Sequence, residues 1–103
     1  MAALIYSIPA IHDLKDIKNY IAEDSILYAT RFLHTIRAKI ATLKKNPELG
    51  RPILAERFAN LRQILFNAYR IVYLYENNVV TIITVHHQSR LLENVPQIKD
   101  YKE

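Results

Sequence analysis

The spacing of apolar residues in the first half of the chain predicts two amphipathic helices. The first helix has apolar residues at intervals of three and four, with polar residues on its other face: Ile11, Leu14, Ile17 and Ile21. The second has a longer stripe: Ala29, Phe32, Leu33, Ile36, Ile40 and Leu43. Asp24 and Ser25 precede this stripe as good N-caps, and Asn46, Pro47 and Gly50 end it. Two helices joined this closely should form an antiparallel pair.

The remaining apolar runs are too short for helices and predict strands. Residues 3–8 form a first run, which Pro9 ends. Three later runs are rich in Ile, Val, Tyr and Thr, with short polar breaks between them: residues 61–66, 69–75 and 79–87. Residues 51–60 show no period and are expected to form a loop. Pro96 interrupts the spacing within residues 91–103, where a short or frayed final segment is expected.

The order of these elements, β-α-α-β-β-β, predicts an α+β fold in which a helical hairpin packs on a small, mainly antiparallel sheet. Nothing in the 103 residues resembles a linker, a repeat or a low-complexity tract. A single domain over residues 1–103 is therefore expected.

Asn77 and Asn78 predict the turn that joins the last two strands, because both residues tolerate the positive φ of a two-residue hairpin turn. This turn would pair Glu76 with Val79, and alternation then puts the following pairs on one face: Tyr75–Val80, Tyr73–Ile82, Ile71–Thr84 and Tyr69–His86. The other face would carry Leu74–Thr81, Val72–Ile83 and Arg70–Val85, followed by His87. This second, more aliphatic face is expected to lie against the helices.

The expected hairpin gathers polar side chains at the open end of the sheet: Tyr69, Arg70, His86, His87 and Arg90. Arg62, on the adjoining strand, is expected to reach the same region. Histidine, arginine and tyrosine can supply the base, the phosphate-binding cations and the acid of a metal-free ribonuclease. They can equally be structural, since a Tyr–His pair across two strands and an arginine bonded to carbonyl oxygens are common devices. The residues alone leave both interpretations open.

The charge distribution gives a second indication of function, because the middle of the chain is strongly basic. The net charge is +4, yet residues 25–75 contain nine basic and only two acidic residues. This favours an acidic or polyanionic partner such as RNA, DNA or an acidic protein segment. The basic residues of the second helix are also explained by a solvated face.

Several functional classes are excluded or disfavoured by composition. The chain has no cysteine and a single glycine, so it has neither a Cys-based zinc site nor a glycine-rich phosphate loop. His86 and His87 point to opposite faces of a strand, and His12 and His34 lie on separate helices, so no metal or other cofactor is expected. No apolar run approaches the ~20 residues that cross a bilayer. A soluble, unprocessed, cytoplasmic protein is therefore expected.

Four segments together resemble the RelE/ParE superfamily of toxins from bacterial type II toxin-antitoxin systems: IYSIPAIHDLKDIKNYIAED, IATLKKNPELGRP, LRQILFNAYRIVYLYE and ITVHHQSR. The pattern is most similar to the ParE-like, plasmid-stabilisation branch. The resemblance implies a small basic toxin that causes growth arrest and is neutralised by a cognate antitoxin with an acidic tail. It implies contact with DNA only through that antitoxin. ParE-like members poison DNA gyrase, whereas RelE-like members cut mRNA on the ribosome.

The residues that distinguish these two branches give a mixed pattern. Arg62 and Arg70 match strand residues that are basic in both branches. Ile64, Gln88 and Asn94 stand where ribonuclease members often have basic or catalytic side chains. Three residues could substitute for them in a nuclease: His86, His87 and Tyr101.

The leading hypothesis is therefore a ParE-like toxin that binds and inhibits DNA gyrase and has no chemistry of its own. Its target- or antitoxin-binding residues would be Arg62, Tyr69, Arg70, His86 and Arg90. The alternative is a RelE-like, metal-independent endoribonuclease acting on ribosome-bound mRNA, with Arg62 and Arg70 holding phosphate and His86 or His87 moving protons. A third hypothesis is an inactive member that only binds antitoxin.

Overall fold

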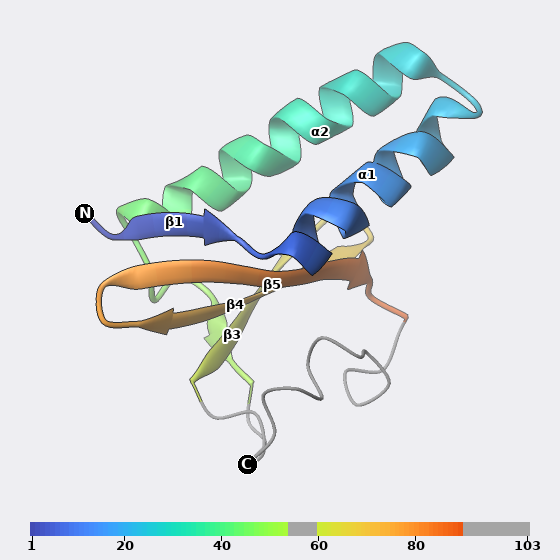
Figure 1. Cartoon of the computed structure of the whole chain (residues 1–103). Helices are drawn as coiled ribbons and strands as arrows, with labels where there is room; N and C mark the ends of the chain where they lie inside the picture. Colours follow the sequence, from blue (N-terminus) through green and yellow to red (C-terminus); the bar gives the residue numbers. More distant parts are fainter. Residues whose placement is uncertain (54–59, 90–103) are drawn as a thin grey trace.

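The described residues form a five-stranded sheet. Figure 1 shows a helical hairpin over one face of this sheet. The computed structural model describes residues 1–53 and 60–89. Its elements are β1 (Ala3–Tyr6), α1 (Ile8–Ala22), α2 (Ile26–Ala41), η1 (Thr42–Lys44), β2 (Arg51–Pro52), β3 (Leu61–Phe66), β4 (Tyr69–Glu76) and β5 (Val79–His87). The order across the sheet is β1-β5-β4-β3-β2. The β1–β5 pair is parallel and the others are antiparallel, which confirms the predicted fold class.

Two serines set where the helices begin. The Ser7 hydroxyl accepts a hydrogen bond from the Ala10 N–H at 3.1 Å, and Pro9 fits the first turn of α1, where no amide partner is needed. α1 therefore begins at Ile8, and the strand predicted over residues 3–8 ends at Tyr6. The Ser25 hydroxyl caps α2 in the same way, through the Tyr28 N–H at 3.1 Å.

The segment expected as a loop over residues 51–60 contains one short strand. β2 pairs with β3 through Arg51 opposite Gln63 and Pro52 opposite Arg62. Sequence periodicity missed it because two residues are too few to show alternation. Residues 54–59 and the final segment expected over residues 91–103 lie outside the described residues.

A bulge divides the β4–β5 hairpin into a half with the predicted register and a half without it. Asn77 and Asn78 have φ values of 54° and 59°, as the predicted turn requires. The predicted pairs hold from Glu76–Val79 to Tyr73–Ile82. Ile83 is then an extra residue, and the remaining pairs are Val72–Thr84, Ile71–Val85, Arg70–His86 and Tyr69–His87. The predicted pairs of this half were wrong because strict alternation cannot reveal an inserted residue.

The start of α1 covers the edge of β5 beside this bulge. Ser7 donates from its hydroxyl to the Ile83 carbonyl and from its N–H to the Ile82 carbonyl, both at 3.0 Å. One Asp13 carboxylate oxygen accepts from the Thr84 hydroxyl at 2.6 Å and from the Val85 N–H at 3.0 Å. β1 pairs with β5 only as far as Ile82, so these bonds replace the ladder beyond it.

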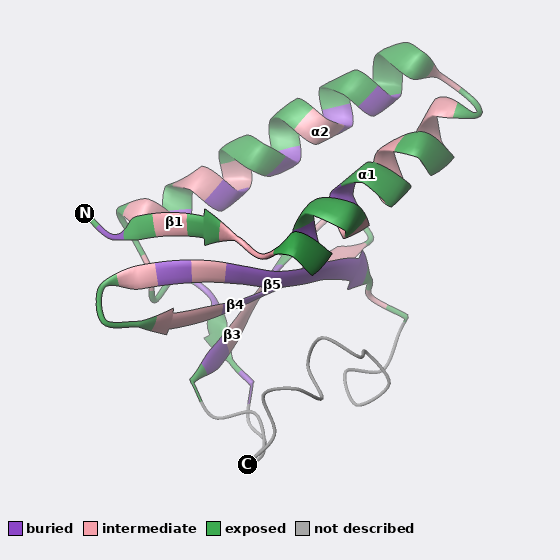
Figure 2. Ribbon diagram, in the orientation of Figure 1, coloured by how far each residue is buried: buried purple, intermediate pink, exposed green. Residues whose placement is uncertain are grey.

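The sheet is buried on both faces, and the prediction of which face meets the helices was wrong (Figure 2). The main core joins the helices to the face that carries Ile71 and Tyr73. The aliphatic face forms a second, smaller cluster in which Val72 and Ile83 pack with Ile53 and Leu61. Hydrophobicity could not identify the helix face, because Tyr73 is fully buried there with its hydroxyl hydrogen-bonded.

Candidate functional site

The predicted cluster at the open end of the sheet is divided between the two faces. Tyr69 and His87 are opposite each other on the helix side, with ring centroids 5.8 Å apart. Tyr69 also packs edge-on against Phe32, with ring centroids at 5.3 Å. Arg70 and His86 are opposite each other and, by alternation, lie on the other face. The structure therefore pairs His86 with Arg70 instead of Tyr69, and it pairs His87, which was expected beyond the last pair, with Tyr69.

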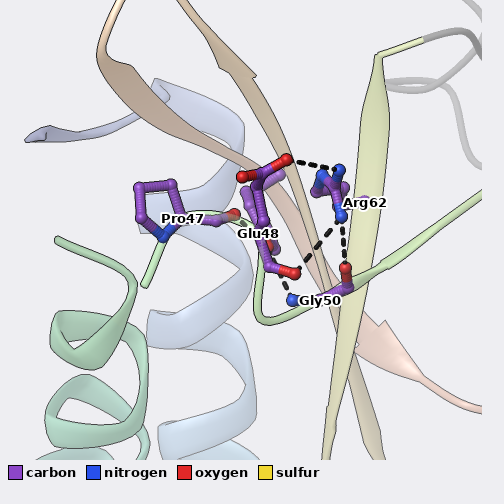
Figure 3. Close-up of polar contacts among 5 residues, drawn as sticks. Pro47, Glu48, Gly50 and Arg62 are labelled. Carbon is purple, nitrogen blue, oxygen red and sulfur yellow. Dashed lines mark hydrogen bonds and ion pairs between the residues drawn. The ribbon is translucent and has the colours of Figure 1, made fainter. Parts of the chain in front are cut away.

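Arg62 does not join this end of the sheet. It lies opposite Tyr73 and donates to the Gly50 carbonyl at 2.8 Å and the Glu48 carbonyl at 3.3 Å (Figure 3). Its guanidinium also forms an ion pair with Glu48 at 3.5 Å. The expectation that Arg62 reaches Arg70 was wrong, because its guanidinium group donates hydrogen bonds to carbonyl oxygens of the turn before β2.

The Tyr73 hydroxyl stabilises the same turn through two hydrogen bonds. The Tyr73 hydroxyl donates to the Pro47 carbonyl at 2.6 Å and accepts from the Gly50 N–H at 2.9 Å. Burial raises the pKa of Tyr73, and the hydrogen bond from Gly50 and the charge of Arg62 lower it in part. A Cβ on Gly50 would lie 2.6 Å from the Tyr73 hydroxyl oxygen, so glycine is required for this close approach.

The two histidines differ in environment. His86 is buried, with 5% of its surface exposed. His87 is exposed, and its Nδ1 lies 2.8 Å from the Ser89 hydroxyl and accepts from the Ser89 N–H at 3.1 Å. Burial, with a smaller effect of Tyr20 and Tyr28, raises the pKa of Tyr69. Arg90 lies outside the described residues.

A basic hollow of about 500 Å³ adjoins the outer part of β3. Its lining contains three cations, two amides and three apolar side chains: Lys39, Arg51, Arg70, Gln63, Gln88, Leu49, Ile64 and Leu65. Arg70 donates to the Gln88 carbonyl at 3.3 Å, and the Gln88 side chain donates to the Asn67 carbonyl at 2.8 Å. We call this site the basic hollow.

Sequence reasoning assigned Arg70 to a site but missed the other two cations of the hollow. Lys39 was explained as part of a solvated helix face, and Arg51 was placed in a loop. The signal that could have found them was the excess of positive charge between residues 25 and 75. Only the fold brings α2, β2 and β4 together around one concavity.

The chemistry of the basic hollow is that of an anion-binding site. Arginine and lysine donate charge-assisted hydrogen bonds to carboxylate or phosphate oxygens. Among the lining residues in the described part of the chain, no histidine, tyrosine, aspartate or glutamate is present to take up a proton. The described residues also contain no group of three or more possible metal ligands. Within the same ranges, no helix has the length and apolar character needed to span a bilayer.

The sequence matches a family model described as ParE toxin of type II toxin-antitoxin system, parDE, over residues 4–92. The chain belongs to this ParE toxin family. It is therefore a type II toxin of the RelE/ParE superfamily, as its sequence segments indicated. No curated protein sequence matches the chain.

Solved structures of related toxins share the ParE fold. A chain of the chromosomal ParDE system from P. aeruginosa superimposes with a TM-score of 0.72 at 17% identity, over 84% of this chain and 96% of that one. A chain of the RelBE2 toxin-antitoxin complex from Mycobacterium tuberculosis gives 0.66 at 20% identity, over 84% and 98%. A mutant of E. coli RelE in the free state gives 0.58 at 16% identity, over 99% and 95%. At these identities the likeness concerns the fold.

Proposed function

We propose that this ParE-family toxin acts by binding and inhibiting DNA gyrase, without cutting a substrate. The observation that supports binding over cleavage is the basic hollow, which supplies cations without a histidine, tyrosine, aspartate or glutamate among its described lining residues. The membership of the ParE family supports gyrase as the target.

Two further contacts weigh against the ribonuclease alternative. A phosphate-holding Arg62 would have to leave the carbonyls of Glu48 and Gly50. His87 lies on the helix side with Tyr69, across the sheet from Arg70. The observation that favours the alternative is that Arg70 faces His86 on the neighbouring strand. An endoribonuclease would therefore depend on the pair Arg70 and His86.

We further propose that a cognate antitoxin neutralises the toxin, and that contact with DNA is made only through that antitoxin. The ParDE and RelBE2 structures are described as a toxin-antitoxin system and a toxin-antitoxin complex. The basic surface of the present chain suits an acidic partner in the cytoplasm. A neighbouring gene for a short acidic protein should relieve growth arrest when it is co-expressed.

Two assays on the purified chain separate the candidate functions. A gyrase supercoiling assay should show inhibition with accumulation of cleaved DNA, and an in vitro translation assay should leave mRNA intact. Cleaved mRNA that disappears with Arg70→Ala or His86→Ala, but persists with the exposed control Lys45→Ala, would instead establish the endoribonuclease. Activity in neither assay would leave an inactive member that binds antitoxin.

A further inference from the structure

The outer edge of β1 has no neighbouring strand within the described residues. β1 lies at the end of the sheet, and its inner side pairs with β5 in parallel. Ala3 and Ser7 donate from their N–H groups toward this inner side, at 3.1 and 3.0 Å. Main-chain groups alternate in direction along a strand, so those of Leu4 and Tyr6 point away from β5. This outer edge can therefore pair with one further strand.

Exposed apolar side chains line the same edge. Met1, Ile5 and Ile8 keep 80%, 51% and 69% of their surface exposed. Ile5 lies on the face opposite the helices, since its neighbours Leu4 and Tyr6 pack against the helix-side core. Natural edge strands often carry a lysine, a proline or a bulge that prevents association, and β1 has none of these. The edge therefore has the properties of an interaction surface.

The composition of this edge favours a second copy of the chain over a charged partner. Residues 1–8 contain no charged side chain, so these residues offer no side-chain ion pair to an acidic or basic partner. Arg37 lies 5.8 Å from the centroid of the Tyr6 ring, which is on the helix side and across the strand from Ile5. Two copies of one strand, related by a two-fold axis, run antiparallel and present the same apolar residues to each other.

We propose that two copies of the chain associate through β1, with the two strands antiparallel about a two-fold axis at Ile5. Ile5 then packs against the partner's Ile5. Leu4 exchanges main-chain hydrogen bonds with the partner's Tyr6, and Ile8 comes close to the partner's Met1. The described strands of both copies form one continuous sheet, and the basic hollows lie toward its two outer ends. This self-association goes beyond the proposed function and does not depend on it.

The size of the apolar edge predicts a weak dimer. Met1, Ile5 and Ile8 together expose about as much surface as two fully exposed side chains in each copy. Such an interface buries less than the ~1,200 Å² in total at which stable complexes begin, so a dissociation constant of about 10–100 µM is expected.

Sedimentation equilibrium of the full chain, between about 5 and about 500 µM, measures this association. Ile5→Lys should weaken the dimer at least tenfold, because it places two like charges opposite each other at the axis. Leu27→Lys is the matched control, since it adds the same charge at a side chain that is 65% exposed. Leu27 belongs to the start of α2, which lies at the end of the helical hairpin away from β1 (Figure 1). This control should dimerise like the unmodified chain.

Cysteine cross-linking tests the register, because the chain has no cysteine of its own. Residues opposite each other on antiparallel strands have Cα atoms about 4.5–5.5 Å apart, which a disulfide can span. Ile5→Cys should therefore give a covalent dimer with oxidised glutathione. Ala3→Cys is the control: Ala3 is exposed on the same face, but its two copies would lie roughly 13 Å apart along the strands. This variant should stay uncross-linked.

Three results would overturn the proposal. The first is a chain that stays monomeric up to about 500 µM, which would leave this edge to a different strand. The second is a dimer that Ile5→Lys and Leu27→Lys weaken equally. The third is equal cross-linking of Ile5→Cys and Ala3→Cys, or none in either. The cysteine variants keep uncharged side chains at both positions, so their comparison decides the question even if Ile5→Lys does not fold.

Discussion

Removing the Tyr73 hydroxyl should destabilise the whole fold through one turn. The hydroxyl bridges the Pro47 carbonyl and the Gly50 N–H at 2.6 and 2.9 Å, and the Tyr73 side chain is fully buried. Tyr73→Phe leaves both main-chain groups without this partner in the interior. An unsatisfied buried group costs about 1–3 kcal/mol, so the free energy of unfolding should fall by about 2–3 kcal/mol.

Urea denaturation followed by circular dichroism measures this loss. A loss of this size lowers the thermal midpoint by roughly 10–20 °C in a domain of this length. Tyr28→Phe is the matched control, because it deletes the same atom from a side chain that is 55% exposed, and it should change stability by less than about 0.5 kcal/mol. If Tyr73→Phe costs no more than Tyr28→Phe, the hydroxyl does not hold the turn.

The same variant also tests how the turn and the basic hollow are connected. Leu49 and Arg51 flank Gly50 and line the hollow. Loosening the turn should therefore weaken binding of a labelled acidic peptide to the hollow by severalfold, even under conditions in which Tyr73→Phe remains folded. Unchanged binding would show that the hollow keeps its shape without this turn.

Three other perturbations follow from the described contacts. Gly50→Ala should cost about 1–3 kcal/mol by overpacking, because the new Cβ would lie 2.6 Å from the Tyr73 hydroxyl oxygen; urea denaturation measures it, and a neutral effect would refute the close approach. Asp13→Ala should cost about 2 kcal/mol, since Thr84 and the Val85 N–H lose their acceptor; a melting temperature equal to that of Asp16→Ala, at an exposed position of the same helix, would contradict this. Burial raises the pKa of Tyr73 in the folded state, so its contribution to stability is present below the unfolded value of 10.0 and is lost as pH rises above it. Unfolding free energies at pH 8 and pH 11 should differ less in Tyr73→Phe than in the unmodified chain, and an equal difference would exclude Tyr73 as a cause.

Local sequence signals predicted the elements of the fold well. Ser25 was identified as a cap, and the two asparagines as a positive-φ turn, because each effect depends on residues close in the chain. The start of α1 was misplaced because an apolar Ile8 before a proline looks like the end of a strand. The helix face of the sheet was misassigned because a tyrosine can be buried when its hydroxyl is bonded, which only the fold can arrange.

The candidate site was less predictable than the fold. Arg70 was placed at the correct end of the sheet, yet its partner across the strands is His86 instead of Val85. The site depends on relations between distant segments, which a period of two or 3.6 residues does not encode. Lys39 and Arg51 approach the same hollow from separate elements, and no local spacing relates them.

The extra residue at Ile83 determines which side chains each face carries at the open end of the hairpin. The asparagine turn fixes one half of the hairpin, so a single-codon deletion at this position would leave that half in place. It would reverse the sides to which Val85, His86 and His87 project. His87, now on the helix side, would exchange faces with His86, while the half of the hairpin nearest the turn would keep its pairing. Such a deletion would thus change the chemistry of both faces at this end of the hairpin, and it would also remove Val85 from the helix-side core.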